Sequence, residues 1–336
     1  MYQISNFKFQ TSSFNLIISL VFSTCLALCS CISTYGNEFE IKHADSLEIN
    51  KNQIKIKGEI LITYKNAKIE AEEGFVKTNE KGKAYKAIFL GNPKIKLKDR
   101  SVGAEKLTVL IDEKKIIAEG NSKTELYDKK NGPIKITANY QEVNWNNEGA
   151  SAKGNIITTY KDTKVLSEIG KILYKNKKPE KALFWGDNTQ STIEQPSNKT
   201  TADELIFDIK TQNIEAFGNA KTTVWPETEV LHENQDPIFV TTENIFLDQN
   251  TGIIQAKSYT TKVTFNYQET SGESNEAFLF KDKETKKTEK IIFKGDANIR
   301  QPDKELISEE VVFSFLDKKL TSNTITNVRP KARIFK

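Results

Sequence analysis

The body of this 336-residue chain lacks cysteine. Its three cysteines, Cys25, Cys29 and Cys31, all lie in the first 31 residues. A disulfide framework and a cysteine metal site are therefore excluded from the remainder. Histidine is almost as scarce, since only His43 and His232 occur and their sequence contexts are unrelated. We expect both histidines at the surface, with no metal bound.

Arginine and an excess of one charge sign are also missing. Only four basic residues are arginines, and 49 basic residues face 45 acidic ones for a formal net charge of +4. A nucleic-acid-binding surface needs basic residues clustered on one face, and arginine suits it best. The composition therefore predicts no nucleic-acid partner.

Motifs that carry catalysis are absent as well. The sequence contains no HExxH, no GxSxG and no glycine-rich phosphate loop. The paired carboxylates Glu72-Glu73 and Glu309-Glu310 are direct neighbours, and neighbouring residues of a strand point to opposite faces. They cannot share a proton, so we predict a protein that is not an enzyme and uses no cofactor.

The N-terminal segment, residues 1–36, has the features of an export signal. It contains no acidic residue, and Lys8 is its only charge. Residues 14–32 are mostly apolar and are followed by small residues, as in secretory signal peptides. We therefore expect the chain from residue 37 onward to lie in the periplasm.

Three fates of this segment remain open. Cleavage after Gly36 would leave a mature chain that begins near Asn37. The stretch Leu28-Cys29-Ser30-Cys31 resembles a lipobox, which would leave a lipid on Cys31. The apolar stretch is also long enough to stay uncleaved as a membrane anchor.

The body is built from internal repeats, with about nine units of roughly 33 residues. One recurring mark is a small residue followed by an acidic or amide residue and then an apolar one. Its nine copies begin at Ala44, Ala71, Ala104, Ala138, Ser167, Ala202, Thr242, Asn275 and Ser308.

A second mark alternates with the first and consists of glycine followed by an acidic or amide residue. Its copies begin at Gly58, Gly91, Gly120, Gly154, Gly186, Gly218 and Gly295, and one copy is skipped near Ala256-Lys257. Glycine and asparagine tolerate left-handed backbone angles, so this mark predicts a turn between strands.

Apolar residues between the marks alternate with period two, as in Ile60, Ile62 and Tyr64. This pattern is typical of strands with one dry face and one wet face, and no part of the body has a sustained helical pattern. The sequence therefore predicts an all-β protein whose units stack, either as an elongated jelly roll or as a β-solenoid. Residues 226–237 are the least strand-like, and we interpret them as a loop or soft boundary between 37–225 and 238–336.

The repeats resemble those of the OstA/LptA/LptC family. The resemblance rests on strands that end in Ala118-Glu-Gly-Asn121 or Ala216-Phe-Gly-Asn219, alternating with starts such as Ala202-Asp-Glu-Leu205, and it covers about residues 41–334. It implies an elongated, twisted, open β-jelly roll with an apolar groove. It also implies lipopolysaccharide transport from the inner to the outer membrane, with stacking through terminal strand edges. Partners would be other jelly-roll proteins, the inner-membrane transporter and the outer-membrane assembly. This chain departs from the family's smallest members in having about twice their repeats.

A carrier of acyl chains needs a dry lining, which the inward face of alternating strands supplies. The predicted lining residues are Ile54, Ile56, Leu107, Val109, Ile111, Leu205, Phe207, Ile209, Phe265 and Phe313. These residues would equally pack a closed core. Lys94, Lys96 and Lys98 are candidates for contact with lipid phosphates, and an ordinary solvated strand face is the alternative.

The terminal edges, Ala44 to Tyr64 and Val311 to Ile325, are the expected docking strands, because unpaired edges recruit further strands. Two rival functions remain open. A structural β-solenoid, such as a surface fibre or adhesin stalk, would also explain the repeats and the export signal. An enzyme acting on envelope polysaccharide would require two carboxylates that face each other in a cleft.

Overall fold

The protein was analysed as a computed structural model that describes residues 7–8, 39–64, 66–128, 132–144, 149–176, 178–227, 232–282, 284–285, 287–322 and 329–335. Of the expected export signal, residues 1–36, only Phe7–Lys8 are among the described residues. No helix in the described part of the chain is long and apolar enough to span a membrane.

The all-β prediction is confirmed. Apart from a single turn of 3-10 helix at His232–Asn234, every regular element in the described part is a strand. The strand pairs are antiparallel, and small closed cores of alternating apolar residues lie between them. This follows from period-two patterning, in which every second residue leaves water.

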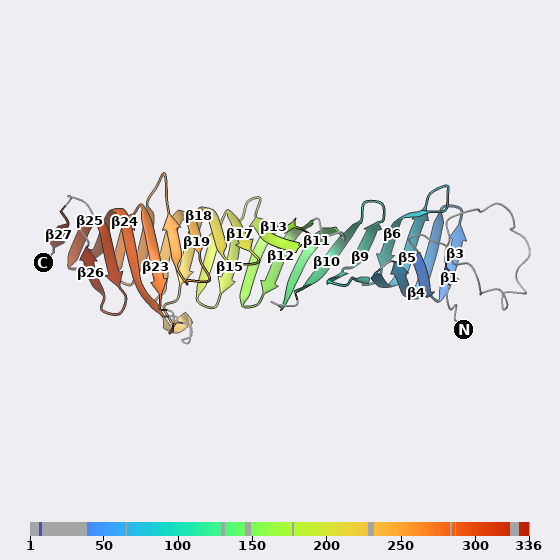
Figure 1. Cartoon of the computed structure of the whole chain (residues 1–336), viewed down its shortest axis with the longest axis horizontal. Coiled ribbons are helices and arrows are strands. Elements are labelled where there is room, and N and C mark those ends of the chain that lie inside the picture. The colour runs from blue at the N-terminus through green and yellow to red at the C-terminus, as the bar shows by residue number, and fades with distance from the viewer. Residues whose placement is uncertain are drawn as a thin grey trace, which may run out of the picture. The chain divides into compact units, whose positions relative to one another are not determined.

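The chain divides into two compact units, residues 1–129 with 140–145 and residues 130–139 with 146–336. Figure 1 shows that the strands of each unit follow one another in chain order. The loop predicted at 226–237 lies within the second unit, and its residues 228–231 are outside the described part. Its role as a soft boundary stays a prediction.

The first unit contains two rows of paired strands. The first row holds β3, β6, β9 and one half each of β4, β5 and β10, whereas the second row holds β2, β7, β8 and the other halves. β1 pairs with β2. The strand bounds are β1 Phe7–Lys8, β2 Phe39–His43, β3 Ser46–Asn50, β4 Gln53–Tyr64, β5 Ala67–Thr78, β6 Ala84–Leu90, β7 Lys94–Lys96, β8 Arg100–Gly103, β9 Lys106–Leu110 and β10 Lys115–Asp128. β11, Gly132–Asn144, contributes residues to both units.

The second unit repeats the same arrangement. Its first row holds β14, β17, β20, β23 and β26, its second row holds β15, β16, β21, β22 and β27, and six long strands give one half to each row. The long strands are β12 Ala150–Tyr160, β13 Thr163–Lys175, β18 Ile214–Val224, β19 Ile238–Leu247, β24 Thr288–Gln301 and β25 Lys304–Ser314. The short ones are β14 Lys178–Trp185, β15 Ser191–Gln195, β16 Asn198–Ala202, β17 Glu204–Asp208, β20 Ile254–Lys257, β21 Val263–Tyr267, β22 Thr270–Ser274, β23 Glu276–Lys281, β26 Lys319–Ser322 and β27 Lys331–Ile334.

Most of the glycine marks are not the turns that the sequence predicts. Gly58, Gly120, Gly154, Gly218 and Gly295 each lie inside one long strand. The pairing register slips at four of them, for example between Phe217 and Ala220, as it does at a β-bulge. A bulge bends a strand without ending it, so one strand can serve both rows. The prediction was wrong because turns and bulges use the same left-handed residues.

The two repeat marks meet at these bulges. Gly218 has φ +72°, and a Cβ there would lie 2.5 Å from the carboxylate of Asp203, the acidic residue of the preceding mark. Asn219, with φ 44°, donates from Nδ2 to Asp203 Oδ2 at 2.9 Å. Glycine is required because the backbone is left-handed and the carboxylate fills the Cβ position. Asparagine tolerates the next left-handed position and satisfies the carboxylate.

Where the glycine mark is skipped, hydrogen bonds to Glu243 take its place. Near Ala256-Lys257, where that mark is missing, the Glu243 carboxylate accepts backbone N–H bonds from Tyr259, Thr260 and Thr261 at 3.0, 2.9 and 2.9 Å. The Thr260 hydroxyl donates to it as well, and these bonds hold the pKa of Glu243 well below its ordinary value. An acidic mark is therefore bonded to the chain here even without its glycine.

Replacing Gly218 by alanine is expected to lower the free energy of unfolding by about 2 kcal/mol, from left-handed strain plus the contact with Asp203. The matched control is Gly82→Ala, since Gly82 has φ +74° but nothing lies within 4 Å of its Cβ position. That control is expected to lose about 1 kcal/mol. Urea unfolding measures both, and equal losses would show that the close approach to Asp203 has no energetic role.

Candidate functional site

The candidate site is the interior between the two rows. All ten predicted lining residues are buried, with exposed fractions from 0% for Ile56 to 8% for Ile111. Seven lie within strands of the first row, and Ile111 and Ile209 directly follow β9 and β17. Only Phe265, in β21, belongs to the second row. A packed core requires the same burial, so lipid contact by these residues stays a prediction.

Apart from Phe265, the second-row half of the lining is missing from the predicted set. It consists of equally buried aliphatic residues on the other side of each bulge, such as Ile62, Ile95, Ile193, Ile238 and Ile299. Period-two alternation marks these residues too. Their alternation keeps its phase across the glycine marks, as in Ala216 and Ala220 of β18, and shifts at the acidic marks, as between Thr242 and Ile245 of β19.

The interior is less uniform than a lining of only Ile, Leu, Val and Phe. Thr200 and Thr222 are completely buried on neighbouring second-row strands, and Thr200 Oγ1 donates to Thr222 Oγ1 at 2.9 Å. This bond offsets the cost of removing the two hydroxyls from water.

Aromatic side chains join the two rows in the last third of the second unit. Phe265, from the second row, has its ring centroid 5.1 Å from that of Phe293 and 6.1 Å from that of Phe313, both in the first row. Tyr267 lies 5.1 Å from Phe315 in an edge-to-face contact. Such pairs contribute about 0.5–1.5 kcal/mol each beyond burial. The two rows are therefore in direct contact here.

Polar contacts also cross between the rows. In each row, the strand ends on the side away from the bulges form a margin. We call the place where the margins of the two rows face each other the mouth. In the second unit, Gln249 Nε2, after β19, donates to Gln195 Oε1 at the end of β15, at 3.0 Å. Lys281 Nζ, at the end of β23, donates to the hydroxyl of Ser197.

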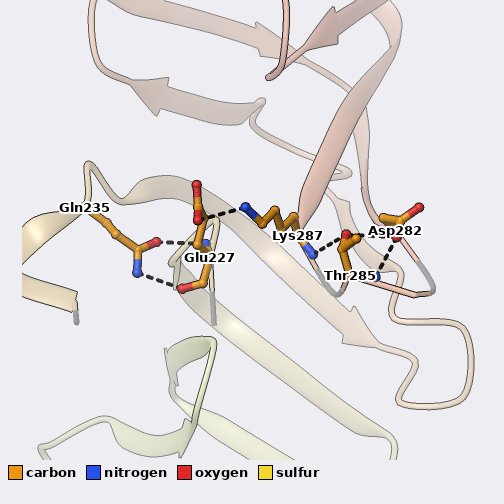
Figure 2. Close-up of polar contacts among 5 residues, drawn as sticks. All are labelled: Glu227, Gln235, Asp282, Thr285 and Lys287. Carbon is orange, nitrogen blue, oxygen red and sulfur yellow. Dashed lines mark hydrogen bonds and ion pairs between the residues drawn. The ribbon is translucent and has the colours of Figure 1, made fainter. Parts of the chain in front are cut away.

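A second pair of crossing contacts involves the segment after β18. The backbone N–H of Thr288 donates to the carbonyl of Pro226 at 3.0 Å. Lys287 Nζ lies 3.0 Å from Glu227 Oε2, and Gln235 holds Glu227 in turn through two bonds to its backbone (Figure 2). On the first-row side, Asp282 Oδ1 accepts from the N–H and hydroxyl of Thr285, and Thr285 Oγ1 accepts from the backbone N–H of Lys287 at 3.4 Å (Figure 2).

Two ionisable groups at this mouth are perturbed. Burial lowers the pKa of Lys281 to about 8. Burial also raises the pKa of the Tyr267 hydroxyl, and the carboxylates of Asp236 and Glu227 add to the shift. Both shifts follow from a dry environment, in which the charged form is disfavoured.

The first unit contains a buried arginine that sequence reasoning did not single out. Arg100, at the start of β8, is 2% exposed, and its guanidinium donates to both carboxylate oxygens of Asp99 at 3.1 and 2.9 Å. Its Nη1 also donates to the carbonyl of Asn144, at the end of β11, at 3.5 Å. In the sequence, only the position of Arg100 directly after Asp99, where a turn leads into a strand, indicated this contact.

The three candidate lysines for phosphate contact lie at the exposed surface. Lys94 and Lys96 flank the buried Ile95 in β7, so they stand on the outer face of the second row. Lys96 Nζ lies 3.3 Å from each carboxylate oxygen of Glu70 on the neighbouring strand. Lys98 follows in the turn before β8. Phosphate contact by all three stays a prediction.

The residues weighed for catalysis or metal binding do not gather in one place. The Glu72 side chain lies beside Gly91, whereas Glu73 lies near Lys55 and Lys57. His43 Nε2 is 4.0 Å from Asp45 Oδ1, and the side chain of His232 is outside the described part. No group of three metal-ligating side chains occurs among the described residues.

The terminal edges differ in detail from those expected. Val311 to Ser314 pair with β24 on one side and β26 on the other, so among the described strands the C-terminal edges are β26 and β27. At the N-terminal end, β3 pairs with β4, whereas β2 also pairs with β1. Residues 323–328, which include Ile325, are outside the described part.

Comparison with known proteins gave a structural likeness and no likeness in sequence. No protein-family model matches the sequence, and no curated protein matches it. The chain is similar to the crystal structure of LptH, the LptA-homologous periplasmic component of the lipopolysaccharide transport device of Pseudomonas aeruginosa. The identity is 12%, the TM-score is 0.25, and the match covers 52% of this chain and 94% of LptH.

Proposed function

We propose that this chain is an exported periplasmic carrier of lipopolysaccharide, built as an elongated, open jelly roll of about nine repeats. Lipid acyl chains would occupy the interior between the two rows. The observation that supports this most is the two-row arrangement itself, because folding each long strand at a bulge encloses one apolar layer through each unit. The likeness of the repeat marks to the OstA/LptA/LptC family supplies the lipid class.

The energetics of such a carrier are favourable. Each buried CH₂ contributes about 0.8 kcal/mol, so several acyl chains would hold the lipid firmly. Sliding requires that no single contact dominate, and a lining dominated by aliphatic side chains meets this condition. The inner-membrane transporter and the outer-membrane assembly would be the terminal partners, and other jelly-roll proteins would dock on the edge strands. Lipid phosphates would meet lysines such as Lys94, Lys96 and Lys98.

A structural role without lipid is the second candidate. It is favoured by the ring contacts around Phe265, which bring the two rows together in part of the second unit. Under this reading the apolar layer is a packed core.

Photo-crosslinking in cells separates the two roles. A benzoylphenylalanine at Phe207, whose ring faces inward, is expected to form an adduct with lipopolysaccharide, whereas one at the adjacent outward Ile206 is not. Benzoylphenylalanine is also placed at a second pair of positions, inward Ile209 and exposed Lys210. This pair still gives a result if the substitution at the more central Phe207 prevents folding. No adduct from either inward position in folded, exported protein would sink the carrier role and favour the structural one.

A further inference from the structure

We propose that the mouth of the second unit is held closed by a latch, and that a lipid enters the interior there only when the latch opens. The latch consists of the Glu227–Lys287 ion pair, the Ser197–Lys281 and Gln195–Gln249 hydrogen bonds, and the ring contact between Tyr267 and Phe315. This inference rests on the proposed lipid carriage and adds its regulation.

The contacts are arranged as a latch because each one joins the two rows. Ser197 and Gln195 lie at the turn between β15 and β16, and Glu227 follows β18, all on the second-row side. Gln249, Lys281 and Lys287 lie on turns or strand ends of the first row. Strand pairing alone would leave these two margins free to separate.

The partners are distant in sequence, which sets them apart from ordinary turn contacts. Gln195 and Gln249 are 54 residues apart, Glu227 and Lys287 are 60 apart, and Ser197 and Lys281 are 84 apart. The ion pair is solvent-accessible, with side-chain exposures of 43% and 56%, so water competes for it at little cost. An accessible ion pair is weak, which suits a contact that must open.

Beneath the polar contacts lies an apolar seal. Tyr267 contacts both Phe313 and Phe315 from the opposite row, and Phe315 is only 8% exposed. A bound acyl chain would replace these ring contacts with contacts of its own. Opening therefore exchanges one apolar surface for another and exposes little of it to water.

The test locks the mouth reversibly. In a background in which Cys25, Cys29 and Cys31 are changed to serine, the pair Glu227→Cys and Lys287→Cys is bridged with a reducible bis-methanethiosulfonate reagent. The readout is the rate of lipopolysaccharide adduct formation by benzoylphenylalanine at Phe207 in the purified protein. We expect the bridged protein to react at least tenfold more slowly, and dithiothreitol to restore the rate.

The matched control bridges Lys257→Cys and Glu276→Cys, an ion pair of 2.7 Å between adjacent strands of the first row. That bridge does not cross the mouth, so the adduct rate should stay unchanged. Equal rates for the bridged and reduced latch variants would overturn the latch and leave lipid carriage standing. If no variant forms an adduct even after reduction, lipid carriage itself fails, and the latch fails with it.

Discussion

Changing Lys281 to methionine is expected to stabilise the protein at pH 7 and to remove a pH dependence of its stability. The pKa of Lys281 falls from 10.5 in the unfolded chain to about 8 in the folded one, because burial disfavours the charged amine. Between these two values the unfolded state binds more protons, so stability should rise as the pH increases from about 8 to 10.5. Below that window both states are charged, and the full penalty is present.

The penalty has an upper bound of about 3 kcal/mol, from 1.36 kcal/mol for each unit of pKa difference. Methionine keeps the length of the side chain and removes the charge, and the Ser197 hydroxyl loses a partner worth about 1 kcal/mol. A net gain of about 2 kcal/mol at pH 7 is therefore expected.

Urea unfolding of both proteins at pH 7, 9 and 10.5 measures this effect. Lys287→Met is the control, since the side chain of Lys287 is 56% exposed and its removal relieves no burial penalty, so it should give no comparable gain at pH 7. A parent protein whose stability is flat across this window would contradict the burial of Lys281, as would a methionine variant that keeps the parent's slope.

Removing the carboxylate of Asp99 is expected to cost about 3 kcal/mol, because it leaves the guanidinium of Arg100 buried without its bidentate partner. The side chain of Asp99 is 46% exposed, which places the cost at the lower end of the range for buried pairs. Arg100→Met removes the buried charge instead, whereas the Asp99 side chain, 46% exposed, already reaches water in the folded protein. Its effect should stay within about 1 kcal/mol.

A double-mutant cycle tests this difference between removing the carboxylate and removing the guanidinium. With Arg100→Met already present, Asp99→Ala should cost clearly less than it does in the parent protein, since no buried guanidinium loses a partner. The free energies of unfolding of the four proteins in urea give the coupling directly. Similar losses for the two single variants would mean that the guanidinium reaches water in the folded state.

Much of the fold was predictable from local patterns. Alternation such as that of Leu205, Phe207 and Ile209 is a property of a few consecutive residues, and the structure buries all three. The glycine marks were assigned the right backbone chemistry, since Gly218 and Asn219 both adopt positive φ. They were assigned the wrong element, because a turn and a bulge have the same local requirement. Only the pairing with the neighbouring strand distinguishes a bulge from a turn.

The candidate site was predictable only in part. Alternation marks the buried residues of both rows, but which of them face one another across the interior depends on how the strands pair. Arg100 and Lys281 are ordinary residues in sequence terms. Their burial depends on segments from elsewhere, such as Asn144 for Arg100 and Ser197 for Lys281.

The sequence by itself determined the class of structure and the repeat, because strand alternation and left-handed glycines act within a few residues. Only the tertiary structure decided which half of each long strand joins which row, and how the mouth of the second unit is held. Ties such as the one between Ser197 and Lys281 join residues 84 positions apart. A contact of that kind leaves no local pattern, since its free energy arises only once both rows are in place.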